Sequence, residues 1–329
     1  MSQKFPLLSV APMEGLTGVV FRQVHSRLFG GADVYYIPFV TPTILPKFTE
    51  RQLRELAPTV NAGLHVVPQL LTRRTEDFIW AAKTLGEMGY DEVNLNVGCP
   101  AGTVVAKGKG SGFLRTPADL DHFLDTVCEA DLGVEISVKT RLGWADESEF
   151  DLLSNVFDRH RLKTLIIHPR LKSDQYKGQV RTHVFEKYYD GFNVPIGYNG
   201  DLTTVADIVA TKERFGGLQQ IMVGRALMAD PALFRKVKGG PSASREEIVG
   251  FTRELFESYA RAFDSRKNAL MRIKEYWFYQ LNLFEGAQAY AKNLFKSKTP
   301  EAFDEALRPI VEELPIRTDA YFGWFKPID

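Results

Sequence analysis

Hydrophobic and polar positions alternate between two textures from Leu7 to about Val237. Short apolar or β-branched runs are followed by longer stretches with apolar residues at helical spacing, which is the pattern of strand–helix units. The runs that predict strands are residues 7–11, 34–39, 65–70, 92–97, 135–140, 164–168, 195–198 and 220–223. Eight strands separated by helices predict an α/β protein with a closed (β/α)8, or TIM, barrel.

The stretch after Thr116 and Pro117 is a typical predicted helix, because threonine favours the N-cap and proline the first helical position. One apolar stripe follows at helical spacing, formed by Leu120, Phe123, Leu124, Val127 and Cys128. We therefore expect Cys128 to be a small hydrophobic core residue.

The pattern changes near residues 238–242, where glycine and proline cluster and no strand follows. Amphipathic helices are predicted instead at 246–263, 268–283, 287–295 and 300–311. The sequence thus predicts a barrel domain over residues 1–240 and a small helical bundle over 245–329.

Composition narrows the protein class. With 44% hydrophobic and 25% charged residues, the 329-residue chain can bury a large core, which excludes intrinsic disorder. Its 41 basic and 41 acidic residues balance, so any basic face must be local. Two cysteines form no disulfide framework or zinc-type cluster. No apolar run is long enough for a membrane helix, and the first residues do not resemble a signal peptide. We expect a cytoplasmic monomer without metal or membrane attachment.

Polar residues and glycines follow nearly every predicted strand. A barrel places its active site at the C-terminal ends of its strands, so their shared position predicts one site there. The residues concerned are Ala11, Pro12, Met13, Gln69, Asn96, Cys99, Lys139, Arg141, His168, Arg170, Asn199, Gly200, Asp201, Gly224 and Arg225.

The last two strand ends favour a phosphate site. Barrel enzymes often bind phosphate at the loops after strands seven and eight, through backbone N–H groups and a helix N-terminus. Gly200 and Gly224 would allow close approach, and Arg225 could neutralise the charge. The alternative is that both glycines only serve tight turns.

Cys99 stands between Gly98 and Pro100 at a strand end, in the expected barrel mouth. A lone cysteine is commonly inert and buried, but a thiol in such a mouth can act as a general acid. Lys139 and His168 have the same two interpretations, as structural residues or as parts of the site.

The combination of strand-end segments resembles the dihydrouridine synthase family. The matching segments are residues 11–15 (APMEG), 96–100 (NVGCP), 139–144 (KTRLGW), 168–170 (HPR), 198–201 (YNGD) and 223–225 (VGR), in the family's order. The resemblance implies FMN in the barrel mouth, NADPH as electron source, hydride delivery to C6 of a uridine and protonation of C5 by Cys99.

The resemblance also assigns roles to other residues. It places Gln69, Lys139 and His168 at the flavin ring, with Ala11, Pro12 and Met13 beside the cofactor. It gives the ribityl phosphate to Asn199, Gly200, Asp201, Gly224 and Arg225. Asn96 and Arg170 would face the uracil. Gly102, Val105 and Pro169 depart from the family's usual residues near the substrate, so the resemblance does not select a uridine position.

An RNA substrate, tRNA in this family, must be bound through positive charge. Lys107 and Lys109 lie beside the cysteine, and further basic residues follow the sixth strand and occur in the tail. The same lysines could simply be solvated surface residues. Two other functions remain open: an FMN barrel that reduces a small molecule, and a non-catalytic RNA-binding relative.

Overall fold

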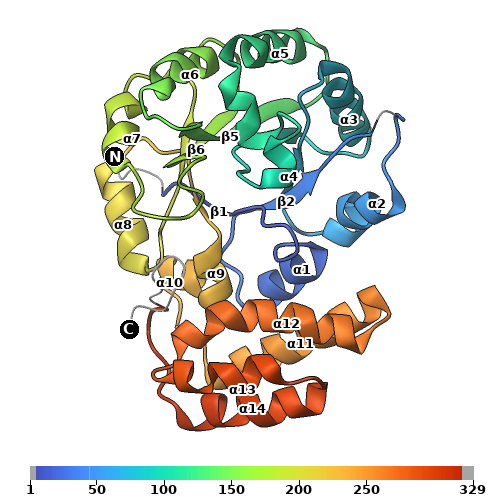
Figure 1. Ribbon diagram of the computed structural model, residues 1–329, viewed down its shortest axis with the longest axis vertical. Coiled ribbons are helices and arrows are strands. Elements are labelled where there is room, and N and C mark those ends of the chain that lie inside the picture. Colours follow the sequence, from blue (N-terminus) through green and yellow to red (C-terminus); the bar gives the residue numbers. More distant parts are fainter. Residues whose placement is uncertain (1–4, 44, 321–329) are drawn as a thin grey trace. The chain divides into compact units, whose positions relative to one another are not determined.

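Eight parallel strands close into a barrel in the computed structural model, which describes residues 5–43 and 45–320 (Figure 1). Each strand pairs with the next one along the chain. Their bounds are β1 Leu7–Val10, β2 Val34–Val40, β3 Val66–Leu70, β4 Glu92–Val97, β5 Glu135–Gly143, β6 Thr164–Leu171, β7 Ile196–Asn199 and β8 Gln220–Val223. The predicted barrel is confirmed, and β5 and β6 extend three residues beyond their predicted ends.

Helices surround the strands, as the amphipathic stretches predicted (Figure 1). Those that follow β2 to β7 include α2 (Glu50–Leu56), α3 (Thr75–Glu87), α4 (Gly102–Val105), α5 (Pro117–Glu129), α6 (Glu149–Asp158), α7 (Thr182–Tyr189) and α8 (Val205–Arg214). Helix α5 begins at Pro117 and buries the predicted stripe. The expectation for Cys128 is wrong: this residue is half-buried, since it lies at the edge of the stripe in the last helical turn.

Apolar side chains fill the barrel, as they must where strands carry helices on their outer face. One core cluster joins buried residues from four strands and the residue after β1, namely Ala11, Val34, Tyr36, Val67, Ile166 and Met222. The barrel is therefore a packed core that presents a site only at its mouth.

Contacts group the chain into two units. The barrel unit contains the residues up to Pro12, Val34–Asp201 and Lys212–Met222. The helical unit contains Met13–Asp33, Leu202–Thr211 and the chain from Val223 onward. The predicted division at residue 240 into a catalytic and an RNA-binding domain stays a prediction, whereas the contacts add the segment after β1 to the tail.

The helical unit contains the helices predicted in the tail. They are α11 (Arg245–Phe263), α12 (Arg266–Gln280), α13 (Ala291–Lys296) and α14 (Pro300–Glu313). The same unit also contains α1 (Val19–Leu28), α9 (Arg225–Ala229) and α10 (Leu233–Val237). The Phe21 ring of α1 stacks on Tyr276 of α12 at a centroid distance of 5.9 Å. Phe251 of α11 meets Phe21 edge-on at 6.2 Å. These aromatic contacts explain why α1 groups with the tail.

Within the two described ranges, no helix combines the length and the apolar character needed to cross a membrane.

Candidate active site

Most of the predicted site residues of the barrel unit lie on or just after β3 to β7, and Ala11 and Pro12 follow β1. Strand register brings them together in pairs, because Asn96 on β4 is the partner of Lys139 on β5. In the same way Arg141 on β5 is the partner of His168 on β6. Neighbouring parallel strands therefore deliver an amide, a lysine, an arginine and a histidine to one rim of the barrel.

A chain of buried hydrogen bonds underlies this rim. Asn96 Nδ2 donates to Gln69 Oε1 at 2.7 Å, and Gln69 Nε2 donates to Asn94 Oδ1 at 2.8 Å. Asn94 Nδ2 then donates to Ser137 Oγ, which donates to Glu92 Oε1 at 2.6 Å. Gln69, predicted at the flavin ring, is fully buried. The oxygen and the nitrogen of its side-chain amide each form a hydrogen bond with a neighbouring asparagine. A satisfied buried network of this kind fixes side-chain orientation.

Cys99 is half-buried, and hydrogen bonds fix the backbone on both sides of its thiol. Asn96 Oδ1 accepts from the N–H groups of Gly98 and Cys99, at 3.1 and 2.9 Å. The Cys99 carbonyl accepts from the N–H and the hydroxyl of Ser111, at 3.0 and 2.9 Å. The loop after β4 thus holds the thiol in one place with few degrees of freedom.

Gly110 shows how closely this loop returns to the cysteine. A Cβ at Gly110, whose φ is +56°, would lie 2.7 Å from the Cys99 carbonyl oxygen. The position therefore requires glycine for both its backbone conformation and its contact. The segment that carries Lys109 is consequently fixed against Cys99.

Lys139 is the electrostatic neighbour of Cys99. Burial, and to a smaller extent the nearby charge of Arg141, lower the pKa of Lys139 to about 7, although Cys99 acts to raise this pKa. In residues 5–43 and 45–320, no hydrogen bond or ion pair occupies the Lys139 ammonium. A lysine that titrates near neutral pH beside a thiol is typical of a functional site.

Arg141 crosses from β5 to both neighbouring strand ends. Its Nε donates to the Gly98 carbonyl at 2.9 Å, and its Nη1 donates to the Leu171 carbonyl at 2.9 Å. Its guanidinium carbon also lies 5.2 Å from the centre of the Tyr176 ring. Arg141 therefore ties the Cys99 loop to the end of β6.

Arg170, which was predicted to face uracil, is buried and engaged with the protein. Its guanidinium forms an ion pair with both carboxylate oxygens of Asp201 and donates to the Gly178 carbonyl. Its Nη1 lies 3.2 Å from His168 Nε2. These contacts make Arg170 a residue that orients His168 and neutralises Asp201.

The predicted phosphate residues fall in both units. In the barrel unit, Asn199 donates to the Met222 carbonyl at 2.8 Å. A Cβ at Gly200 would lie 2.9 Å from Val180 Cγ1, so glycine permits close backbone packing there. In the helical unit, Gly224 is the N-cap of α9 and Arg225 is its first residue.

The predicted site residues after β1 are also divided between the barrel unit and the helical unit. Ala11 is buried and Pro12 half-buried in the barrel unit. Met13 belongs to the helical unit, where its N–H donates to Thr17 Oγ1 at 2.8 Å.

Tyr176 was not among the predicted site residues. Its ring centroid lies 6.4 Å from that of His168, and 38% of the residue is exposed. The signal that could have found it is an aromatic residue in the loop after β6, but such a loop has no periodicity from which to infer a direction. Of the two predicted RNA-contacting lysines, Lys107 is exposed and Lys109 is half-buried.

Acidic, histidine and cysteine side chains do not form a group of three suited to a metal ion anywhere in the part of the chain that the structure describes.

Comparison with known proteins identifies the family of this chain. The family model described as dihydrouridine synthase matches residues 9–314. A tRNA-dihydrouridine(16) synthase of Neisseria meningitidis serogroup B is 27% identical over 316 residues, covering 92% of this chain and 93% of that protein. A probable tRNA-dihydrouridine synthase of Staphylococcus epidermidis is 29% identical over 287 residues, covering 79% and 82%.

The barrel also resembles a solved reductase structure in its fold. Morphinone reductase superposes with a TM-score of 0.52 at 13% identity, covering 74% of this chain and 93% of that one. Since that likeness concerns the fold alone, the family assignment rests on the sequence match over nearly the whole chain. This chain belongs to the dihydrouridine synthase family, a family of oxidoreductases.

Proposed function

We propose that this protein reduces the C5=C6 bond of a uridine in tRNA to dihydrouridine, with FMN as cofactor, NADPH as electron source and Cys99 as proton donor. Support comes from the family match over residues 9–314 and from relatives whose names specify tRNA-dihydrouridine synthesis. The observation that carries the proposal is a thiol fixed just after β4 near a half-buried lysine, Lys139, whose ammonium has no hydrogen bond or ion pair within the described residues.

The residues at the barrel mouth fit FMN. Lys139 offers a cation that no described side chain neutralises, and such a cation suits the electron-rich edge of a flavin. His168, almost buried, adds a ring nitrogen oriented by Arg170. Gly200 lacks a side chain where the backbone must pack closely, which suits a phosphate held through N–H groups. When bound, FMN supplies the hydride.

The carboxylate of Asp201 requires an explanation, because it would repel a phosphate. Its ion pair with Arg170 removes most of that repulsion. We therefore assign to Asp201 a role through its backbone and its pairing with Arg170. Gly224 and Arg225 complete the proposed phosphate-binding set by the family resemblance, as do Ala11, Pro12 and Met13 for the cofactor's surroundings.

Cys99 has the chemistry that the second half of the reduction needs. Addition of hydride at C6 leaves an electron pair at C5, and the Cys99 thiol donates its proton there. Cys99 becomes a thiolate, which the ammonium of Lys139 stabilises through the electrostatic interaction of the two groups. Water returns the proton to the thiolate afterwards.

Asn96 and Arg141 position the proton donor. Asn96 accepts from the N–H of Cys99, and Arg141 binds the carbonyl of the preceding glycine. The predicted contact of Asn96 with uracil remains compatible with this role, since Asn96 lies in the same rim. The substrate's backbone would be bound by lysines outside the mouth, Lys107 and Lys109 among them.

The proposal is tested with the purified protein in two steps. The visible spectrum should show flavin bands that bleach when NADPH is added without oxygen. The reduced protein should then convert uridine to dihydrouridine in unmodified tRNA transcripts, as detected by mass spectrometry of digested nucleosides. No flavin, even after reconstitution with FMN, would overturn the proposed reaction, whereas bleaching without dihydrouridine would leave a small-molecule reductase.

A further inference from the structure

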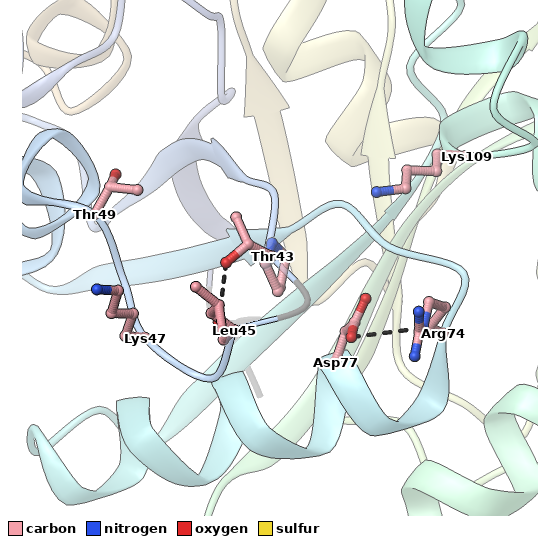
Figure 2. A pocket seen from close by; sticks show the side chains of 8 residues that line it. Thr43, Leu45, Lys47, Thr49, Arg74, Asp77 and Lys109 are labelled. Carbon is pink, nitrogen blue, oxygen red and sulfur yellow. Dashed lines mark hydrogen bonds and ion pairs between the residues drawn. The ribbon is translucent and has the colours of Figure 1, made fainter.

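A cavity lies beside the Cys99 loop in the barrel unit, with a volume of about 730 Å³. Side chains from three segments surround it (Figure 2). Thr43, Leu45 and Lys47 follow β2, Arg74 and Asp77 follow β3, and Lys109 follows β4. Because all three segments leave the C-terminal ends of their strands, the cavity opens on the same end of the barrel as Cys99.

Positive charge dominates the lining. The lining contains three cations, Lys47, Arg74 and Lys109, and one carboxylate, Asp77, which lies 3.6 Å from Arg74 in an ion pair (Figure 2). For the ammonium groups of Lys47 and Lys109, the described residues provide neither a hydrogen bond nor an ion pair. The lining thus carries more positive than negative charge, and its one carboxylate is already paired with Arg74.

The groups around Lys109 do not favour its charged form. Partial burial lowers the pKa of Lys109, and the charges of Lys107 and Arg74 lower it further, while Asp77 raises it. Each of these influences except Asp77 disfavours the ammonium. An anion in the cavity would reverse the balance, because it would favour the charged form of every cation around it.

The cavity has features that suit a nucleotide better than a free ion. Leu45 is 63% exposed at its rim and offers an apolar surface to a ribose or a base. Lys109 directly precedes Gly110, whose backbone packs against Cys99. A phosphate bound to Lys109 would therefore belong to a nucleotide that is close, along the RNA strand, to the nucleotide whose base lies at the thiol.

We propose that this cavity binds a backbone phosphate of the RNA strand that carries the target uridine, close to that nucleotide. The inference rests on the proposed function and adds to it a binding site formed by Lys47, Arg74 and Lys109. Lys47 is assigned a role in phosphate binding because it lines the cavity. A phosphate contact of this kind gives register and affinity without sequence preference.

The test compares the flavin-loaded protein with its Lys47→Ala and Lys47→Ala/Lys109→Ala variants. Lys83→Ala is the matched control, because Lys83 is an exposed lysine on α3 outside the cavity. Affinity for unmodified tRNA transcripts is measured at several salt concentrations. The double variant should bind about tenfold more weakly, and the slope of log affinity against log salt concentration should be smaller by about one phosphate contact.

Three outcomes are informative. Loss of RNA affinity in both cavity variants but not in Lys83→Ala supports the inference. Equal RNA affinity in all variants overturns it, while dihydrouridine formation by the unaltered protein would still support the proposed function. If only the KM for NADPH rises, with the KM for NADH and the RNA affinity unchanged, the cavity binds the 2′-phosphate of the reductant and the RNA assignment is wrong.

Discussion

The barrel unit and the helical unit position their loops by different means. In the barrel unit, the Cys99 loop is fixed by residues of its own strand, of the loop itself and of the adjacent strand, namely Asn96, Ser111 and Arg141. In the helical unit, the loop after β1 is fixed by helix α12, more than two hundred residues away in the chain: the Tyr276 hydroxyl donates to the Leu16 carbonyl, and the Arg272 guanidinium packs on Gly15.

This difference has a consequence for the two sets of predicted cofactor residues. The side chains around Cys99 depend on strand register, which the whole barrel core maintains. The segment that contains Met13 depends on one distant helix. We therefore expect changes in the barrel unit to act on chemistry directly, and changes in the helical unit to act first on the stability of a loop.

The largest expected effect in the barrel unit is that of Cys99→Ala. Loss of a positioned general acid should reduce the rate of dihydrouridine formation by about 10²- to 10⁴-fold. Flavin content and affinity for RNA should stay as they are, since the loop's hydrogen bonds to Cys99 use its backbone. The rate is measured in a single turnover of flavin-reduced protein with saturating tRNA transcript.

Cys128→Ala is the matched control for this substitution. Cys128 is half-buried at the end of α5, and burial raises the pKa of its thiol to about 11. It should therefore not take part in proton transfer, and its variant should react like the unaltered protein. Equal rates in Cys99→Ala and Cys128→Ala would exclude Cys99 as the proton donor.

The next effect tests whether the thiol's position matters as much as its presence. Asn96→Ala removes the acceptor of two N–H groups and leaves them without that partner. We expect the rate of reduction to fall about 10- to 100-fold, because small displacements of a catalytic group are costly. Asn96→Asp keeps the acceptor and should recover part of the rate, whereas a merely structural role would make both variants equally unstable to heat.

Lys139 gives a smaller, pH-dependent effect. Its pKa of about 7 lies below the ordinary lysine value, so the cofactor-free protein loses this charge as the pH rises through 7. Binding of an anionic cofactor raises this pKa, so the contribution of the ammonium to FMN affinity is complete below pH 7 and is lost as the pH rises through the pKa of the complex. We expect FMN affinity to decrease from pH 6 to pH 9.

Lys139→Gln sharpens this expectation. The variant should bind FMN about tenfold more weakly at pH 6, and the difference from the unaltered protein should narrow towards pH 9. Flavin fluorescence titrations of the cofactor-free protein measure both curves, and the phosphate of FMN affects them equally. A constant ratio of affinities across this range would show that the charge of Lys139 does not contribute.

The sequence predicted the barrel because its evidence was local. Continuous apolar runs located all eight strands, and the residues after each run located the site. Runs such as 135–140 were predicted too short, because polar Arg141 continues β5 where an apolar pattern would end. The contacts of Arg170 with Asp201 and His168 could not be predicted, since they depend on which way side chains from separate strand ends turn.

In the helical unit, the packing partners of the helices could likewise not be predicted from the sequence. The stripes on α11 and α12 predicted that both helices bury one face, but an apolar stripe does not identify its partner. That partner includes α1, through Phe21 and its ring contacts with Tyr276 and Phe251. Segment Met13–Asp33 therefore belongs to a unit whose other helices follow more than two hundred residues later.

The smallest predicted effect tests this long-range support at Gly15. Gly15 has a φ of +80°, and a Cβ there would lie 2.5 Å from Arg272 Nη1. Gly286 has a similar φ of +74° with nothing within 4 Å of such a Cβ, so it is a control for backbone strain in the same unit. We expect Gly15→Ala to lower the free energy of unfolding by about 1 kcal/mol more than Gly286→Ala does.

Arg272→Ala separates the contact from the strain. In the Gly15→Ala/Arg272→Ala protein the added methyl group no longer meets the guanidinium, so the cost of Gly15→Ala should fall to that of Gly286→Ala. Urea denaturation of the four proteins gives this coupling as a double-mutant cycle. A coupling of zero would mean that α12 does not fix the loop after β1, and the contrast between the two units would then rest on Tyr276 and its bond to Leu16.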